Sequence, residues 1–520
     1  MRRELTTYLR LPMSRIETGA TLSRRPALAG GLLLVLMLLT GLGWAVSSPV
    51  ESSPDDNYHL GSIWCPRPAG ESCQTSVVDG DPVVRVPIAV ADESMRCYVL
   101  QSNKSAGCAL GYDDSHMVWS KRFDNGAYPI GYYHFHHLLV GKDVQTSVLV
   151  MRGVNVLIAV TLLGTIGFCA PRQLRRPFIG AIVASWVPMG VYFIASNNPS
   201  SWAVSGLMAY SAATFMAPQQ NGRRRIALVI CAVIGAVMCL TSRYDAAFFL
   251  LVVGLALLFA VPWKRGGWIG LSALAGVALL GFGTFMASSQ VSKVAYFLRV
   301  FEASDPAKSA DKQPFFEKLL VGLETAPKYL GGFWGHTWTP GWHDVPLGAR
   351  APYVLTIMAA GAFVAVGLRR GGWRKWTALA IIVGSMVLLP ALFYANGAMD
   401  TIELYQARYI FPLLAPTFFL MLAVDQDEGA WFTVPQAVWV TVFISLCQTI
   451  TLHTLLLRFV QGAQERWELD LNKHIEWWWS APVSPMMVWF LTTCFATAAL
   501  GTAIAMLTRT AEKYEAPQES

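Results

Sequence analysis

The feature that most constrains this chain is the clustering of its apolar residues into long runs, with little helical or strand periodicity. Only 14% of the residues are charged, whereas a soluble protein has about 25%. Runs of about 18 or more apolar residues are typical of transmembrane helices. The sequence therefore predicts an all-α polytopic membrane protein.

The apolar runs predict about twelve transmembrane helices. They lie at 29–48, 146–169, 177–195, 202–217, 226–241, 246–262, 268–287, 351–368, 376–394, 409–424, 436–458 and 485–508. The first span thus stands alone, and the others form two groups, 146–287 and 351–508. The remaining segments are tails at 1–28 and 509–520, a first loop at 49–145, a second loop at 288–350, and an amphipathic stretch at 459–484 within the last group.

Lysine and arginine are distributed unevenly between the two sides of the predicted membrane. The tails and the loops on their side contain twenty of them, whereas the short loops of the other side contain only Arg243 and Arg408. Because basic residues concentrate in cytoplasmic loops, we expect both termini inside and both long loops outside. The net charge of +7 then reflects topology and not nucleic-acid binding. Span 29–48 follows Arg24 and Arg25 like a signal peptide, but eleven further spans favour a retained signal-anchor.

The cysteines agree with this topology. Four of the nine, Cys65, Cys73, Cys97 and Cys108, lie in the first loop, and the other five lie in apolar spans. An even set in an oxidising compartment predicts two disulfides. Among the three connectivities we favour the sequence neighbours, Cys65–Cys73 and Cys97–Cys108, with free thiols as the alternative. Turn residues and β-like runs such as PVVRVPIAVA predict a small disulfide-stapled lobe.

Two further outer segments carry amphipathic patterns. In the second loop, SKVAYFLRVFEASDPAKSADKQPFFEKLLVGL predicts one or two amphipathic helices, and the Gly/Trp-rich run GGFWGHTWTPGWHDVPLG follows. The tryptophans of RWELDLNKHIEWWW, at 466–479, suit a membrane–water interface. Trp334, Trp338 and Trp342 of the Gly/Trp-rich run could pack on sugar rings or could anchor the loop at the interface.

Most ionisable residues near the span ends gather on the predicted outer side. Charged groups at membrane depth are costly, so they are candidates for function. The candidates, with one neighbouring amide, are Asp55 and Asp56 after the first span, Arg152 and Asn155 in the second, Arg243 and Asp245 in TSRYDAA, His343 and Asp344 in GWHDVPL, and Glu403 and Arg408 in TIELYQARYIFPL.

These residue types suit one kind of chemistry. A carboxylate in an outer cavity can take a proton from a hydroxyl, and arginines at the same level can hold a phosphate and stabilise its charge as it leaves. The combination fits transfer of a sugar from a lipid phosphate to an acceptor hydroxyl. Structural interpretations compete: a polar turn for the aspartates, snorkelling for Arg152 and Arg408, a turn-stabilising pair for Arg243 and Asp245, and loop shaping for Asp344.

Metal binding is a separate hypothesis. HFHH at 134–137, with His59 and His116 in the same loop, could supply imidazole ligands. An aromatic belt at the membrane interface explains this run better. Asp55 or Asp56 could instead hold a divalent cation such as Mg²⁺, Mn²⁺ or Ca²⁺.

Seven short motifs carry a family resemblance, and they follow one another in order between about residues 30 and 425. They are SPDDNYH (53–59), YPIGYYHFHHLLVG (128–141), Arg152 at the start of the second span, SNNPSSW (196–202), SRYD (242–245), GWHDVPL (341–347) and ARYIFPL (407–413). With them the chain resembles the GT-C superfamily of integral membrane glycosyltransferases. It is more closely similar to a bacterial family of membrane proteins of unknown function that are predicted GT-C enzymes. The chain departs from that family's pattern at Ile130 and Gly131 in place of Pro-Leu, at Ala407 in place of Gly, and at Asp56 in place of Glu.

The resemblance implies an inverting glycosyltransferase in the bacterial plasma membrane. Its donor would be a polyprenyl-phosphate sugar, and its acceptor a hydroxyl of a cell-envelope glycan or glycolipid on the outer face. Asp55 or Asp56 would be the general base, with Asp56 slightly favoured because Asp55 follows Pro54 in a turn. Arg152, Arg243 and Arg408 would bind the donor phosphate. Residues near the sugar or the acceptor would be His59, Asn155, Asp245, Trp342, His343, Asp344 and Glu403.

Two other classes of function compete with this hypothesis. A transporter or flippase for a lipid-linked glycan would also need many spans and intramembrane arginines. Such proteins usually place key groups near the midplane, whereas the charges here gather on one side. A non-catalytic envelope scaffold, with a partner bound to the first loop, is the other alternative.

Overall fold

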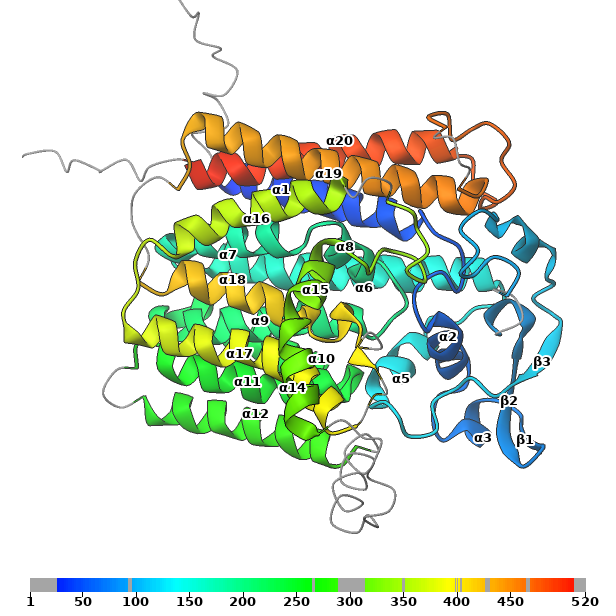
Figure 1. The fold of residues 1–520 in the computed structure, drawn as a ribbon, viewed down its shortest axis with the longest axis horizontal. Helices are drawn as coiled ribbons and strands as arrows, with labels where there is room; N and C mark the ends of the chain where they lie inside the picture. Colours follow the sequence, from blue (N-terminus) through cyan, green and yellow to red (C-terminus); the bar gives the residue numbers. More distant parts are fainter. Residues whose placement is uncertain are drawn as a thin grey trace, which may run out of the picture.

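The fold is a bundle of roughly parallel α-helices with a small lobe at one end, seen in a computed structural model of the chain (Figure 1). The structure describes residues 26–91, 96–263, 267–288, 314–347, 351–397, 399, 401–402, 405–425, 431–463 and 468–508. The lobe comprises most of residues 56–137, and we refer to the end of the bundle that carries it as the lobe end.

The bundle has a helix at each of the twelve predicted positions. In chain order these are α1 (Pro26–Ala45), α6 (Val144–Cys169), the pair α7 (Arg172–Ser185) and α8 (Pro188–Ile194), α9 (Ser200–Met216), α10 (Gly222–Ser242), α11 (Tyr244–Ala260), α12 (Trp268–Met286), α16 (Ala351–Gly367), α17 (Trp373–Ala395), α18 (Leu414–Ala423), α19 (Val434–Val460) and α20 (Pro485–Thr508).

The number of spans is smaller by length and composition than the twelve expected. Within the described residues, seven helices are long and apolar enough to cross a membrane, or eight if the pair α7–α8 is one span. The apolar helices α11, α16 and Phe411–Ala423 are shorter, and α9 has 17 residues. The helix positions are therefore confirmed, whereas the count of twelve spans is not.

Local sequence explains where several helices begin, bend and approach each other. The Asp143 side chain accepts from the Thr146 N–H and caps α6. Pro188 disfavours helix at the residue before it, and α7 and α8 meet there at 92°. Gly206 of α9 faces Gly235 of α10, where a Cβ on either residue would lie under 3.0 Å from the backbone oxygen of the other. Small residues of this kind let transmembrane helices pack closely.

The lobe is built on a three-stranded antiparallel sheet with the order β1 (Thr75–Val78), β2 (Asp81–Pro87) and β3 (Met117–Ser120). The β1–β2 turn is Asp79–Gly80, both with positive φ, as two-residue hairpins require. The predicted disulfides Cys65–Cys73 and Cys97–Cys108 are both present. Three short helices complete the lobe: α2 (Asp56–Trp64), α3 (Ala69–Ser72) and α5 (Gly131–His137).

The other two outer segments differ in how far they follow their predicted patterns. In the second loop, α14 (Phe315–Glu324) agrees with the end of the amphipathic run, whose residues 292–313 lie outside the described part. The short helix α15 (Ala326–Gly331) follows the run. The described residues 468–484 form turns and irregular backbone. Trp477 and Trp479 are buried there, and Trp477 packs against Phe459. These two tryptophans therefore contact protein, and their placement at a membrane–water interface stays a prediction.

Candidate functional site

The polar segment between α1 and α2, residues 46–55, is held by side chains from the rest of the molecule; we call it the strap. Its carbonyl groups accept hydrogen bonds of 2.6–3.2 Å. Each donor is a side chain from another part of the chain. Trp479 donates to the carbonyl of Val46, Arg152 to those of Ser48 and Pro49, Tyr98 to that of Val50, Trp342 to that of Glu51, Tyr192 to that of Ser52, and both Asn198 and Arg408 to that of Pro54. A buried backbone needs such partners, and here they fix the conformation of the strap.

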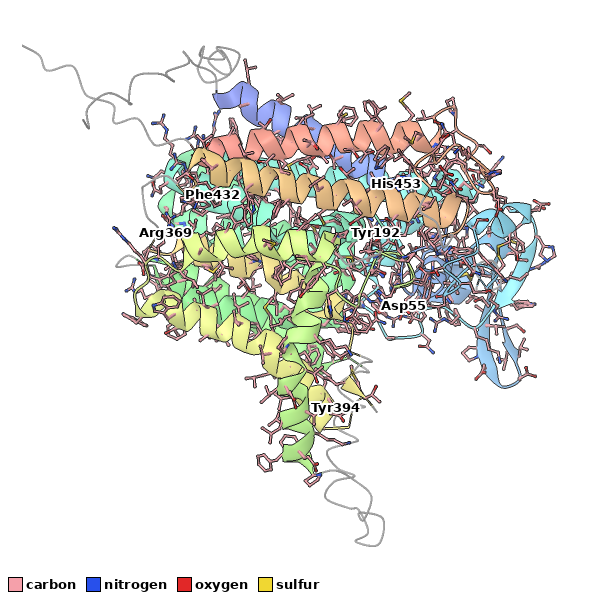
Figure 2. The ribbon with its side chains drawn as sticks, turned by 45° about the horizontal axis from the view of Figure 1, so that its top comes forward. Asp55, Tyr192, Arg369, Tyr394, Phe432 and His453 are labelled. Atoms are coloured by element: carbon pink, nitrogen blue, oxygen red, sulfur yellow. A yellow bond between two sulfur atoms is a disulfide. The ribbon has the colours of Figure 1, made fainter. Side chains whose placement is uncertain are left out.

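The last residue of the strap, Asp55, and the first residue of α2, Asp56, differ in exposure. Asp55 adopts a left-handed conformation with φ of 63° as N-cap of α2, and its side chain is 32% exposed. Asp56 has no exposed surface, and its carboxylate accepts from the backbone N–H and the hydroxyl of Ser53. Asp55 is therefore the aspartate that a bound molecule can reach. Figure 2 places it at the lobe end of the bundle.

Charge separates the same two residues. Burial by itself would raise the pKa of Asp55, but Arg408, together with His59 and Arg122, holds this pKa below its ordinary value. Burial raises the pKa of Asp56 to about 6, although Arg152 and the hydrogen bonds from Ser53 oppose the increase. Asp55 is thus ionised at neutral pH and partly exposed, so its carboxylate can accept a proton from a hydroxyl that is bound within hydrogen-bond distance.

Arg152 has no free donor for a phosphate. Its five N–H groups are directed to Asn197 Oδ1, to the carbonyls of Ala45, Ser48 and Pro49, and to the Ser52 hydroxyl. Its Nη2 also lies 4.0 Å from Asp56 Oδ2, and its side chain is 1% exposed. A guanidinium has five donors, so this geometry favours a role in positioning the strap.

Arg243 and Arg408 line the site beside Asp55. Arg243 donates two hydrogen bonds to Asp245, at 2.8 and 2.7 Å, and Arg408 Nη2 donates to Asp55 Oδ2. Both guanidinium groups lie over the ring of Tyr409, at 5.6 and 5.0 Å from its centroid. Two cations stacked on one tyrosine are therefore neighbours, and the pair concentrates positive charge next to the Asp55 carboxylate.

The sequence did not single out Arg122, which completes this cluster. Its Nη2 lies 3.8 Å from Asp55 Oδ1, and its side chain is 45% exposed. Its guanidinium lies over the Tyr58 ring at 5.5 Å. Arg122 lies 67 residues along the chain from Asp55 and in a polar loop, so only the fold of the lobe brings the two together. We use the name acid–arginine cluster for Asp55, Arg122, Arg243 and Arg408.

His59 and Asn155 lie behind the cluster in buried positions. His59 Nδ1 lies 2.9 Å from the Tyr133 hydroxyl, and its Nε2 has no hydrogen-bond partner in the described structure. Burial lowers the pKa of His59 to about 3, so the imidazole is neutral. Asn155 contacts His136 and Trp202 through Oδ1 and donates from Nδ2 to the Ser196 carbonyl. These contacts favour a structural role for Asn155.

The predicted residues of the second loop approach the site from the other side. His343 Nε2 lies 3.2 Å from Gln406 Oε1, which also accepts from Arg408 Nε. Asp344 Oδ2 accepts from Arg458 Nη2 at 2.6 Å. Trp342 holds the strap, as described above. Glu403, also predicted near the substrate, lies outside the described residues.

Arg458 is a second residue that the sequence did not single out. It is completely buried at the end of α19 and donates to the carbonyls of Tyr98 and Lys104 as well as to Asp344. A long apolar run containing a single arginine near its outer end could have indicated it, but the run continues directly into polar sequence.

The described residues give little support for a metal site. No group of three or more His, Cys, Asp or Glu in the described part of the chain is arranged to hold an ion. His134, His136 and His137 each have a ring nitrogen within 3.0 Å of a protein oxygen. Asp56 is fully engaged by Ser53, and Asp55 faces two guanidinium groups that would repel a cation. A divalent ion at these aspartates does not fit the geometry.

The fold and the site together define a helical membrane protein with an acid–arginine cluster beneath a disulfide-stapled lobe. The model of the family described as "Predicted membrane protein (DUF2142)" matches residues 38–417, and the chain belongs to this family. No match was found among curated proteins or among solved structures. Family membership agrees with the predicted resemblance to membrane proteins of unknown function and does not itself indicate an activity.

Proposed function

We propose that the protein is an inverting glycosyltransferase that moves a sugar from a polyprenyl phosphate to a hydroxyl of an envelope glycan or glycolipid. The observation that carries this proposal is the Asp55 carboxylate, which is ionised, partly exposed and flanked by the guanidinium groups of Arg408 and Arg122. The strap fixes it in a left-handed conformation, and strained residues held in this way are common at active sites.

The proposed reaction needs one base and one anion site. Asp55 takes the proton of the acceptor hydroxyl as its oxygen attacks the anomeric carbon of the donor. The bond from that carbon to the phosphate oxygen breaks on the opposite face, and the electron pair leaves with the polyprenyl phosphate. Arg243 and Arg408 stabilise the growing charge on the phosphate. Arg152 and Asp56 hold the strap, so we now favour Asp55 over Asp56 as the base.

The first test replaces the base by its isosteric amide. Asp55→Asn should lower the transfer rate by at least about 100-fold, because a positioned general base contributes about 10²–10⁴-fold. The assay uses purified protein in nanodiscs, a panel of radiolabelled polyprenyl-phosphate sugars, and acceptor glycolipids from bacterial envelopes. Asn tolerates the left-handed conformation well, so folding should be retained.

The matched control is Asp79→Asn, because Asp79 is also an aspartate with positive φ but lies in the exposed β1–β2 turn. Its transfer rate should equal that of the wild type. Undiminished transfer by Asp55→Asn would remove the base assignment. If no donor supports transfer while fluorescent glycolipids cross vesicle membranes that contain the protein, the chain is a flippase and not a transferase.

A further inference from the structure

A polar cavity lies between the lobe and the second loop, outside the acid–arginine cluster. It has a volume of about 540 Å³ and is lined by Leu100 and Ser102 of the lobe and by Gly335, His336, Thr337, Thr339 and residues 343–347 of the second loop. Small-molecule sites are typically about 300–1,000 Å³. The cavity is therefore large enough for part of a substrate, and it is separate from the Asp55 carboxylate.

The lining of this cavity is polar but carries no free charge. It contains no Arg or Lys, and its one carboxylate, Asp344, is bonded to the Arg458 guanidinium and to the Leu100 N–H. Burial lowers the pKa of His343, so its imidazole is neutral at pH 7. The remaining polar groups include the hydroxyls of Ser102, Thr337 and Thr339.

The same lining also offers apolar surface. Leu100, Val345, Pro346 and Leu347 contribute apolar side chains to the wall. An anionic ligand does not fit, because it would need cationic donors that the lining lacks. A lipid chain does not fit either, because it would leave the hydroxyls and imidazoles of the wall without hydrogen bonds. A sugar ring presents both hydroxyl groups and apolar C–H faces, so its chemistry matches this mixture.

The second loop holds the cavity in a fixed shape. Thr337 and His343 both have positive φ, of 71° and 64°. Such conformations cost about 1–3 kcal/mol and persist where the surroundings impose them. His343 Nδ1 is bonded to the Thr339 carbonyl, and Asp344 is clamped by Arg458. The wall is thus preorganised, as ligand sites commonly are.

The cavity is connected to the proposed base by a short chain of contacts. His343, in the wall, contacts Gln406 at 3.2 Å, and Gln406 accepts from Arg408, which in turn donates to Asp55. A molecule seated in the cavity is therefore connected to Asp55 only through His343, Gln406 and Arg408. A sugar unit held there would therefore be a neighbour of the reacting unit of an acceptor glycan, because the base must itself contact the hydroxyl that reacts.

We propose that this cavity is the acceptor subsite and that it binds an uncharged sugar unit of the acceptor glycan. The inference rests on the proposed function, because it names the substrate class that the same site would take. It also restricts the class of acceptor, because an acidic polymer or a lipid hydroxyl without a sugar would not be bound in the cavity.

The test fills the cavity and measures sugar binding without transfer. Ser102→Phe places a ring at the half-exposed lobe side of the cavity. Ser76→Phe, in the exposed strand β1, is the control for the same change. Full-length protein in nanodiscs is titrated with three neutral trisaccharides (mannotriose, galactotriose and arabinotriose) and with trigalacturonate, by calorimetry and tryptophan fluorescence.

We expect at least one neutral trisaccharide to bind the wild type and the Ser76→Phe control equally, and at least tenfold more weakly to Ser102→Phe. Trigalacturonate should bind at least tenfold more weakly than that sugar. Absence of binding by all three, equal binding by Ser102→Phe, or preference for trigalacturonate would overturn the inference.

Kinetics separate this inference from the proposed function. Where transfer is observed, Ser102→Phe should raise the KM for the acceptor at least tenfold and leave the KM for the donor unchanged. A rise in the donor KM alone would contradict the acceptor assignment while leaving the transferase intact. A third outcome is that neutral sugars bind but neither the wild type nor Asp55→Asn transfers any sugar. This result would contradict the proposed reaction and would still support a cavity that binds glycans.

Discussion

Two adjacent aspartates illustrate how strongly position decides the chemistry of a residue. Asp55 and Asp56 have the same side chain and follow each other in the chain, yet one is ionised and partly exposed and the other is buried. The left-handed conformation of Asp55 turns its carboxylate toward Arg408, whereas Asp56 folds back onto Ser53. The difference arises from the backbone of the strap and not from composition.

The pH dependence of transfer should report the partner of Asp55. Arg408 holds the pKa of Asp55 below its ordinary value of 3.8, so wild-type kcat/KM should fall only as the pH drops below that value. In Arg408→Gln the burial remains and the positive charge is lost, so the pKa of Asp55 rises and the acidic limb moves to higher pH. The ratio of kcat/KM at pH 5 to that at pH 7 measures this change.

If Arg408 also binds phosphate, Arg408→Gln lowers kcat/KM at both pH values. The ratio of the two values cancels this common loss. Arg122→Gln is the control, because Arg122 is more exposed and lies 3.8 Å from Asp55; solvent screens such a charge, and the ratio should change less. By linkage, the Asp55–Arg408 pair stabilises the fold above pH 3.8 and loses this effect as the pH falls through the lower pKa of the folded state. If the ratio is unchanged in Arg408→Gln, the acidic limb of kcat/KM does not report the ionisation of Asp55.

At the residue scale, the sequence predicted which charged residues lie together better than it predicted their contacts. The rules of membrane topology are enough to bring Asp55, Arg243 and Arg408 to one side of the membrane. The sequence could not show that Arg152 donates to Ala45, to the strap and to Asn197, since these partners lie about 45 to 107 residues away in the chain. Arg122 and Arg458 were missed for the same reason.

At the scale of elements, Arg458 at the end of α19 connects three segments that are distant in the chain. Its guanidinium donates to Tyr98 and Lys104 in the lobe and to Asp344 in the second loop. The Tyr98 hydroxyl in turn donates to Val50 of the strap. A single buried cation thus ties the lobe, the second loop and the strap to the bundle.

Arg458→Met should release this connection. Removing one partner of a buried ion pair costs about 3–5 kcal/mol, and the Leu100 N–H bonded to Asp344 would lose its fixed acceptor. Hydrogen exchange measured by mass spectrometry should therefore become at least tenfold faster at residues 98–104 and 341–347. Transfer should fall through a higher acceptor KM, because the cavity wall loses its shape.

Peptides from β2 and β3 are the internal reference, since the sheet is paired independently of Arg458. Arg458→Lys keeps the charge and should restore part of the protection at 341–347. Faster exchange throughout the lobe would instead indicate that Arg458 supports the whole fold, and unchanged exchange at 341–347 would contradict the clamp.

Helices and disulfides were the elements best predicted by the sequence. Apolar runs indicate a helix because a backbone in lipid must satisfy its own hydrogen bonds, and cysteine spacing favoured the two observed pairs. The lengths of spans were harder to predict. α9 is buried on nearly all sides by other helices, so the length of its apolar run reflects packing within the protein as well as membrane thickness. The break between α7 and α8 depends on a single proline, Pro188, whose effect on a helix varies with its surroundings.

At the scale of the whole molecule, charge is arranged along the bundle. The acid–arginine cluster lies at the lobe end, and Figure 2 places Arg369 at the opposite end from Asp55. Two arginine groups, which begin at Arg172 and Arg223, lie at the starts of α7 and α10. If basic loops face the cytoplasm, the lobe, the strap and the cavity all face the outer side.

Cysteine labelling at the two ends of α6 tests this orientation. With 26 residues, α6 is about 39 Å long at 1.5 Å per residue, long enough to cross a bilayer. Exposed Lys142 precedes it at the lobe end, and exposed Arg172 follows it. Since Cys494 is the one exposed free thiol in the described part of the chain, Lys142→Cys and Arg172→Cys are each made in a Cys494→Ser background.

In intact cells an impermeant maleimide should label only Lys142→Cys, and permeabilisation should add Arg172→Cys. Labelling of Arg172→Cys alone would put the acid–arginine cluster inside, where an acceptor on the outer face could not reach it, and labelling of both would mean that α6 does not span.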